Sequence, residues 1–297
     1  MKKKVTGERI FDILNITFMV IFCITILYPF VQQVVLSISS PAESSVISLH
    51  LFVKNPTLDS YKRLFITGNI AKAYYWTVMR TIIGTLLTVT ISSMLAYPLS
   101  KKGYWGRKVW MGLIVMTMFF SGGLIPTYIL VRNLHMMNTI WSLVIPGLCS
   151  AWTIIIIRNF FSAIPEEVEE SAKIDGANDL VVFFKIVLPL SAPVLATITL
   201  WTMVGHWNSW FDAMIYITGQ KILVLQILLR QILADSVSMS GMSDILAASQ
   251  LEREGQQYNP ESVKAAMLLI ATLPILCVYP FLQKYFVKGI MVGSVKG

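Results

Sequence analysis

Hydrophobic residues dominate six stretches of this 297-residue sequence, and polar or charged segments separate each stretch from the next. Each stretch has roughly the 20 apolar residues that an α-helix needs to cross the hydrocarbon core of a bilayer. The pattern predicts an all-α, polytopic membrane bundle of six transmembrane helices. The predicted spans are residues 11–36, 74–98, 109–131, 137–158, 190–217 and 262–283.

Composition agrees with a membrane protein, since 55% of the residues are hydrophobic and 13% are charged, whereas soluble domains carry about 25% charged residues. Glycine and proline interrupt the spans, which is tolerated where neighbouring helices or a cavity satisfy the freed backbone groups. We therefore expect a bundle that encloses a path, with kinks at Pro29, Gly84, Gly122-Gly123 with Pro126, Pro146-Gly147, Pro193, and Pro274 with Pro280.

The basic residues indicate the orientation of the spans. More than half of the 24 Lys and Arg residues lie at the two termini and in the loops after the second and fourth spans, and short cytoplasmic loops carry such an excess. Arg80 is an exception, because it lies inside the second span. The first span is longer than a signal core of about 7–15 residues, so we expect it to remain uncleaved. The predicted divisions are a cytoplasmic tail at 1–10, a transmembrane domain at 11–283 and a cytoplasmic tail at 284–297.

The loop at residues 162–189 is polar, unlike the spans around it. Pro165 suits the first position of a helix, and the glutamates after it place negative charge at the positive end of the helix dipole. Gly176 is a natural left-handed stop, and Asn178 can cap a second helix that we expect Leu188-Pro189 to end. The sequence predicts two short helices at an angle; the alternative is a simple surface hairpin with solvated carboxylates.

Residues capable of catalysis or metal binding form no recognisable pattern. Four glutamates, Glu166, Glu167, Glu169 and Glu170, fit a solvated helix face better than a metal site or an acid pair. The histidines, His50, His135 and His206, fall in separate segments, and the cysteines, Cys23, Cys149 and Cys277, are expected to be small buried residues rather than a disulfide. The chain has no phosphate-binding loop of the G-x-x-x-x-G-K-[ST] type, so we expect no ATP binding by this chain.

The fifth span has one polar face. At about 100° per residue, Trp201, Gly205, Asn208 and Asp212 fall within about 60° of one another, and His206 flanks them. Polar residues inside a membrane usually face a cavity, and sugars are held by aromatic faces together with amide and carboxylate groups. The face predicts a substrate path; the alternatives are packing against a partner subunit, or an Asp212 that sits among outer headgroups.

Residues 218–260 form a second polar segment, which we expect to be an extracytoplasmic loop. The part at 222–234 is too short to span, and Gln226 and Arg230 share one face, so it is expected to lie at the outer interface. The net charge of +8 fits a membrane surface and gives no argument for nucleic acid.

The polar loop carries a recognisable motif: Glu170-Ser171-Ala172, three residues, Gly176, nine residues, and Ile186-Val187-Leu188-Pro189. It resembles the EAA loop of permease subunits of bacterial ABC importers, in which Ser171 would be Ala. The resemblance covers most of the chain from about residue 70. The ending, from Phe286-Val287-Lys288-Gly289 to Gly293-Ser294-Val295-Lys296-Gly297, resembles the second, maltose-type permease of the carbohydrate branch.

This resemblance implies the fold of a type I ABC importer in the bacterial cell membrane. Two different permeases would form the path, each loop would dock on one of two ATPase subunits that bind ATP and Mg, and an extracytoplasmic binding protein would deliver the sugar. The permease itself would be non-catalytic and hold no cofactor. The implied ATPase-coupling residues are Glu170, Ser171, Ala172, Asp175, Gly176, Ala177, Phe183, Ile186, Leu188 and Pro189.

The leading hypothesis is a permease subunit of a carbohydrate importer, with an oligosaccharide as cargo. A peptide, an amino acid or another small solute remains an alternative cargo. A membrane-embedded enzyme using Asp212 and His206 is a hypothesis from a different class, but no catalytic constellation accompanies these residues. A secondary transporter would need no loop that grips an ATPase and would usually show paired broken-helix repeats.

Overall fold

The computed structural model describes residues 6–44, 52–66, 69–219, 221–238 and 259–293. Within these residues the regular elements are helices, and the only strand pairing is an isolated bridge between Ser39 and Pro56. The chain divides into two compact units: unit 1 is Met1–Asn69 with Leu229–Leu273, and unit 2 is Ile70–Leu228 with Pro274–Gly297. Residues 220 and 239–258 of the predicted 218–260 loop and the last four residues of the C-terminal motif lie outside the described residues.

Unit 1 is built around a long apolar helix. Its elements are α1 (Thr6–Ile38), α2 (Pro41–Ser44), α3 (Asp59–Ile66), the later part of α14 (Leu225–Ser238) and the first part of α16 (Pro260–Gly293). The Tyr61 hydroxyl donates to Ser37 Oγ at 2.9 Å and ties α3 to α1. Asn259 Nδ2 donates to Ser44 Oγ at 2.6 Å and ties the start of α16 to α2. Polar contacts therefore gather where these helices end, and the apolar side chains along α1 stay exposed.

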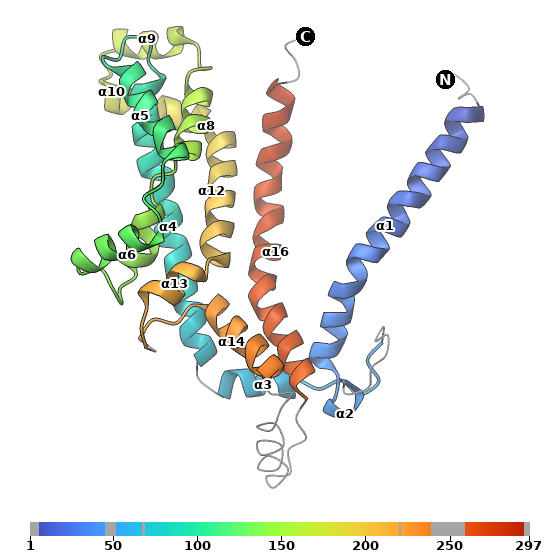
Figure 1. Cartoon of the computed structure of the whole chain (residues 1–297). Helices are drawn as coiled ribbons and strands as arrows, with labels where there is room; N and C mark the ends of the chain where they lie inside the picture. Colours follow the sequence, from blue (N-terminus) through green and yellow to red (C-terminus); the bar gives the residue numbers. More distant parts are fainter. Residues whose placement is uncertain (1–5, 45–51, 67–68, 220, 239–258, 294–297) are drawn as a thin grey trace. The chain divides into compact units, whose positions relative to one another are not determined.

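Unit 2 holds the candidate site and is organised around α4. Its elements are α4 (Asn69–Ser100), α5 (Arg107–Phe119), α6 (Leu124–Asn133), α7 (Trp141–Val144), a 3₁₀ turn (Ile145–Gly147), α8 (Ala151–Phe161), α9 (Glu166–Ile174), α10 (Asp179–Val182), a π segment (Phe183–Val187), α11 (Leu188–Leu190), α12 (Ala192–Asn208) and α13 (Phe211–Tyr216). In Figure 1, α12 runs beside α4, α9 and α10 lie at one end of α4, and α13 lies toward the other.

Small residues on α4 let α12 approach closely. A Cβ added at Gly84 would lie 2.4 Å from Nε2 of His206, so the imidazole occupies the space that any larger residue would need. The rings of Tyr74 and Trp207 meet edge to face, with centroids 5.6 Å apart. At the α9 end, a buried cluster that includes Leu99, Ile157, Phe161, Val182, Phe183 and Ile198 joins α4, α8, α10 and α12. This packing fixes α4 and α12 as one body.

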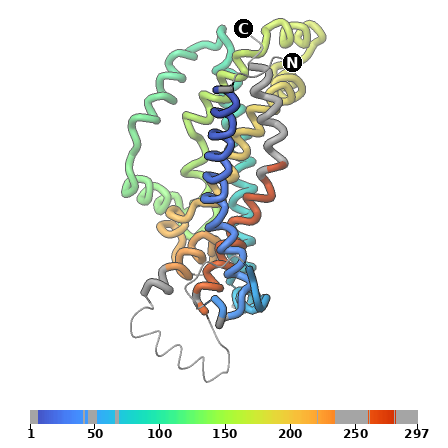
Figure 2. Tube along the Cα trace, turned by 90° about the vertical axis from the view of Figure 1, so that its right-hand side faces the viewer, coloured from blue at the N-terminus to red at the C-terminus, as the bar shows by residue number. Residues whose placement is uncertain are grey.

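Three described helices are long and apolar enough to cross a membrane: Gly7–Ile38, Asn69–Ser100 and Glu261–Val278. Three bent pairs pass the same test when each is taken as one span: α5 with α6 at 113°, Trp141–Gly147 with α8 at 56°, and Asp179–Leu190 with α12 at 79°. The described residues thus provide three candidate spans, or up to six. The predicted number of six is reached only if each bent pair forms one span. Figure 2 shows the α5–α6 pair bowing away from the rest of unit 2.

The helices break at or next to some of the positions where kinks are predicted, and they continue through the others. Breaks occur at Gly122-Gly123, where Gly123 has φ 82°, at Pro146-Gly147, and just before Pro193. Four other positions, Pro29, Gly84, Pro274 and Pro280, lie inside continuous helices. Proline inside a membrane helix frees only one carbonyl, which local adjustments can satisfy, whereas a left-handed glycine reverses the backbone and ends the helix.

The three cysteines, Cys23, Cys149 and Cys277, are free, as expected, but they are exposed rather than buried. Each occupies an apolar helix or loop whose surface faces outward from this single chain. The prediction of a buried position was wrong because hydrophobicity in a membrane protein does not distinguish a packed face from one that meets lipid or another subunit.

Candidate coupling surface and transport path

The first helix of the two-helix loop and the turn that ends it have the geometry that the sequence predicts. α9 begins directly after Pro165, and its first turn carries three glutamates near the positive end of the helix dipole. Gly176 has φ 83°. Its N–H donates to the carbonyl of Lys173 at 3.0 Å, and the N–H of Ala177 donates to the carbonyl of Ala172 at 2.9 Å. This is the paired hydrogen-bond pattern of a Schellman stop, which confirms the predicted role of the glycine.

The second helix differs from its prediction at its end. Asn178 caps it as expected, with Oδ1 accepting from the Val181 N–H at 2.9 Å. Leu188-Pro189 does not end the helix, which continues as α11 to Leu190. The π segment Phe183–Val187 precedes the proline. Its hydrogen bonds join residues i and i+5 instead of i and i+4, so the helix can continue although Pro189 has no N–H to donate. The end comes at Ser191, where the chain bends by 79° into α12.

The motif residues differ in burial: some are exposed at the surface of the hairpin and others pack beneath it. Phe183 is buried in the core of unit 2. Ala172, Ala177, Ile186 and Leu188 are half-buried, and Glu170, Ser171, Asp175, Gly176 and Pro189 are exposed. The Ser171 hydroxyl donates to the carbonyl of Glu167 at 2.6 Å. The serine therefore turns its polar group onto its own helix, which explains how it can stand where the EAA pattern has alanine.

Large apolar side chains are exposed on the same hairpin. Ile174 is 86% exposed, and Val168, Leu180 and Phe184 are exposed as well. Apolar groups of this size gathered on a polar loop make it a candidate interaction surface. We name the exposed face formed by Val168, Glu170, Ser171, Ile174, Asp175, Gly176, Leu180 and Phe184 the coupling surface.

One glutamate of the hairpin is not solvated, contrary to the prediction for all four. Glu169 is 7% exposed and forms an ion pair with Lys101 at the end of α4. The Tyr97 hydroxyl donates to the same carboxylate at 3.4 Å, and Lys101 Nζ lies 4.5 Å from the centroid of the Tyr97 ring. Periodicity could not reveal this anchor, because the partner lies 68 residues away in sequence. Glu169 thus fixes α9 to α4.

Exposed ion pairs surround this anchor. Lys102 lies 2.9 Å from Glu166, and the hydrogen bond and charge of Lys102 lower the pKa of the Glu166 carboxyl. Asp179 lies 2.8 Å from Lys173, and this pairing raises the pKa of the Lys173 ammonium. Pairs this exposed contribute little to stability. Among the described residues, no group of three or more His, Cys, Asp or Glu side chains could hold a metal ion.

The predicted polar face on the fifth span holds only as far as Asn208. Trp201, Gly205 and Asn208 are exposed on α12, with Trp201 52% exposed, while His206 is half-buried against Gly84. α12 ends at Asn208, and Ser209 is extended with φ −73° and ψ 129°. Asp212 therefore belongs to α13, and the single-helix geometry that placed it in line with the others was wrong.

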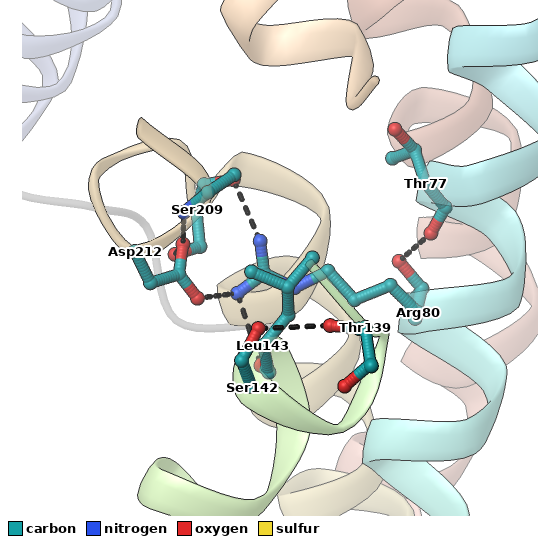
Figure 3. Close-up of polar contacts among 9 residues, drawn as sticks. Thr77, Arg80, Thr139, Ser142, Leu143, Ser209 and Asp212 are labelled. Carbon is teal, nitrogen blue, oxygen red and sulfur yellow. Dashed lines mark hydrogen bonds and ion pairs between the residues drawn. The ribbon is translucent and has the colours of Figure 1, made fainter. Parts of the chain in front are cut away.

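Asp212 instead pairs with Arg80 of α4 (Figure 3). The Arg80 side chain is 2% exposed, and its guanidinium also donates to the carbonyl of Ser209 at 3.0 Å and to that of Leu143 at 3.3 Å. The other carboxylate oxygen of Asp212 accepts from Ser209 Oγ at 2.9 Å and from the Ala213 N–H at 2.8 Å. The sequence offered a signal for Arg80, since a charged residue inside a span is by default a candidate functional residue with a charged partner.

Comparisons with known proteins identify the class. Residues 1–292 match the family described as binding-protein-dependent transport system inner membrane component, so the chain belongs to this family of membrane-embedded transport permeases. It is 41% identical to the polygalacturonan/rhamnogalacturonan transport system permease protein YtcP of Bacillus subtilis, over 98% of this chain and 99% of that protein. It is 25% identical to the arabinooligosaccharides transport system permease protein AraQ of the same species, over 94% of each chain.

A solved structure gives the same result. The chain resembles one in the crystal structure of a bacterial ABC transporter involved in the import of the acidic polysaccharide alginate, with a TM-score of 0.88, 31% identity, and coverage of 96% of this chain and 100% of that chain. This chain is therefore a permease of a carbohydrate ABC importer, as the motif predicted, and the relatives favour carbohydrate over a peptide or amino-acid cargo.

Proposed function

We propose that the cargo of this permease is an acidic, uronate-containing oligosaccharide. Two similar proteins that cover almost the whole chain support this: one is named for the transport of polygalacturonan and rhamnogalacturonan, and the other belongs to a transporter involved in the import of alginate. All three polymers contain uronic acids. Relatives whose names specify arabinooligosaccharides or melibiose, raffinose and stachyose are less similar, at 25% and 28% identity.

Within the complex, the chain forms the path together with a second, homologous permease. An extracytoplasmic binding protein delivers the cargo, and two ATPase subunits bind ATP and Mg and hydrolyse the nucleotide. This chain carries no catalytic group and no cofactor of its own. The exposed apolar groups of the coupling surface support docking on an ATPase, because large apolar side chains gathered on a polar hairpin favour burial against a partner.

The orientation follows from the charge distribution. Both termini and the α9–α10 hairpin lie in the cytoplasm, because Lys and Arg gather in these short segments. The membrane is the bacterial cytoplasmic membrane. The exposed face of α12 then lines the path, with Trp201 stacking on sugar rings, Asn208 hydrogen-bonding to hydroxyls, and His206 and Asp212 beside this face.

The test uses proteoliposomes that contain the complete importer, with its binding protein in excess. Oligogalacturonate should stimulate ATP hydrolysis and enter the vesicles, whereas a neutral arabinooligosaccharide of equal length should do neither. Stimulation by the neutral sugar alone would contradict the acidic cargo while leaving the chain a carbohydrate permease.

A further inference from the structure

A single guanidinium joins three separate segments of unit 2. Arg80 of α4 donates to the carbonyl of Leu143 in α7, to the carbonyl of Ser209 between α12 and α13, and to the carboxylate of Asp212 in α13. Figure 3 shows these groups converging on one side chain from different ribbons. The segments lie 63, 129 and 132 residues from Arg80, so the contacts belong to the tertiary structure alone.

Both carbonyls lie at the end of a helix. α7 ends at Val144, one residue after Leu143, and α12 ends at Asn208, one residue before Ser209. The last carbonyls of a helix have no partner within it, and the hydrocarbon region offers no water to replace one. Arg80 supplies donors at both helix ends.

We propose that Arg80 is a positioning residue of the transport path and that Asp212 is its counter-ion rather than a cargo ligand. Arg80 holds the break between α12 and α13 in place, and this break sets where the face of Trp201 and Asn208 stops. Asp212 has one oxygen on Arg80 and the other on Ser209 and Ala213. Both of its oxygens thus already accept hydrogen bonds from the protein.

The two roles of Asp212 differ in a way that single substitutions cannot show. Removing one member of a buried ion pair leaves the other charged and unpaired, which is strongly destabilising, whereas neutralising both members together removes that penalty. A cargo ligand behaves otherwise, because loss of its contact is not repaired by a change at Arg80. A double-mutant cycle therefore separates a counter-ion from a ligand.

The experiment compares Arg80→Gln, Asp212→Asn and the double variant in the complete importer, with uptake of whichever sugar stimulates the wild-type complex. That choice keeps the result independent of whether the cargo is acidic. Each single variant should lose about tenfold or more in uptake, and the double variant should return to within about threefold of wild type. Lys62→Gln is the matched control, since it breaks an exposed pair with Asp59, and it should leave uptake unchanged.

A second readout reports position without transport. In a background without the three native cysteines, Asn208→Cys marks the end of α12, and its labelling by an impermeant maleimide measures how that end is held. Arg80→Gln should change the labelling rate several-fold, and the double variant should bring it back. If a single variant fails to assemble with its partner subunits, recovery of assembly in the double variant carries the same information.

Two outcomes would overturn the proposal. A double variant as defective in uptake as Asp212→Asn alone, with wild-type labelling in Asp212→Asn, would make Asp212 a cargo-contacting residue. Wild-type uptake and labelling in Arg80→Gln would show that the path does not depend on Arg80.

Discussion

At the scale of single residues, the hairpin depends on two groups with different physical roles. Gly176 is required for its backbone conformation, because its φ of 83° is one that residues with a Cβ rarely adopt. Space is not the reason, since a Cβ there would meet no atom within 4 Å. Glu169 is required for its charge, because it is buried against Lys101 and Tyr97. The first acts on the shape of the coupling surface and the second on its attachment to α4.

Gly176→Val should abolish most coupled transport while membrane insertion persists. A β-branched residue in the left-handed region costs roughly 1–2 kcal/mol, and the Schellman stop would rearrange to avoid that cost. Gly176→Asn is the control, since asparagine tolerates this conformation, and it should retain much more uptake. Uptake and expression are measured for both, and equal uptake by the two variants would contradict a backbone requirement.

Glu169→Ala should uncouple ATP hydrolysis from uptake, because α9 would lose its ion pair with α4 while its docking face stays intact. Glu167→Ala, an exposed neighbour on the same helix, should have little effect. The measurement is the ratio of sugar transported to ATP hydrolysed in proteoliposomes. An unchanged ratio in Glu169→Ala would show that the anchor is not part of the coupling.

At the scale of elements, the close approach of α4 and α12 and the break after α12 shape the candidate path. The approach depends on Gly84, which lies under His206, and the break leaves Trp201 and Asn208 exposed on one face. These features belong to pairs of helices rather than to either helix alone.

Gly84→Ala should lower the thermal stability of the complex by about 1–3 kcal/mol, because the new methyl group overlaps the imidazole of His206. The additional change His206→Ala should recover most of the loss by opening the space. Thermal unfolding of the purified complex checks both steps. If His206→Ala brought no recovery in the Gly84→Ala background, the close approach would not be the cause.

Asn208→Ala should slow uptake roughly 5- to 150-fold, the range that corresponds to about 1–3 kcal/mol for an unpaired hydrogen-bonding group. Basal ATP hydrolysis and complex assembly should survive, since the 17 residues of α12, about 25 Å of helix, separate Asn208 from the hairpin. Asn208→Gln keeps an amide and should lose less. Uptake by Asn208→Ala at the wild-type rate would remove α12 from the cargo site and leave selection to the partner permease and the binding protein.

At the scale of the whole molecule, the sequence has a candidate transport path and a candidate coupling hairpin but no motif of the G-x-x-x-x-G-K-[ST] type for binding nucleotide. The purified single chain should therefore hydrolyse no ATP, whereas the complete importer should do so with stimulation by the loaded binding protein. The measurement is phosphate release from each preparation. Activity in the single chain, free of ATPase subunits, would contradict this division of labour.

The predictions from sequence succeeded where local physics decides the structure. Long apolar stretches, the αL stop at Gly176 and the cap at Asn178 depend on residues close together in the chain, and all three are present in the structure. They failed at two helix ends. The second hairpin helix continues past Leu188-Pro189 because a π segment precedes the proline, and α12 ends at Asn208 instead of continuing to Asp212.

The sequence by itself determined that this is a helical membrane permease with a two-helix hairpin that resembles an ATPase-docking loop, because hydropathy, turn chemistry and a motif all depend on residues close together in the chain. Only the tertiary structure decided that Glu169 is buried, that His206 lies over Gly84 and that Asp212 belongs to Arg80. The physical reason is that a charge or an imidazole takes its role from the group that packs against it, and here those groups lie 68, 122 and 132 residues away.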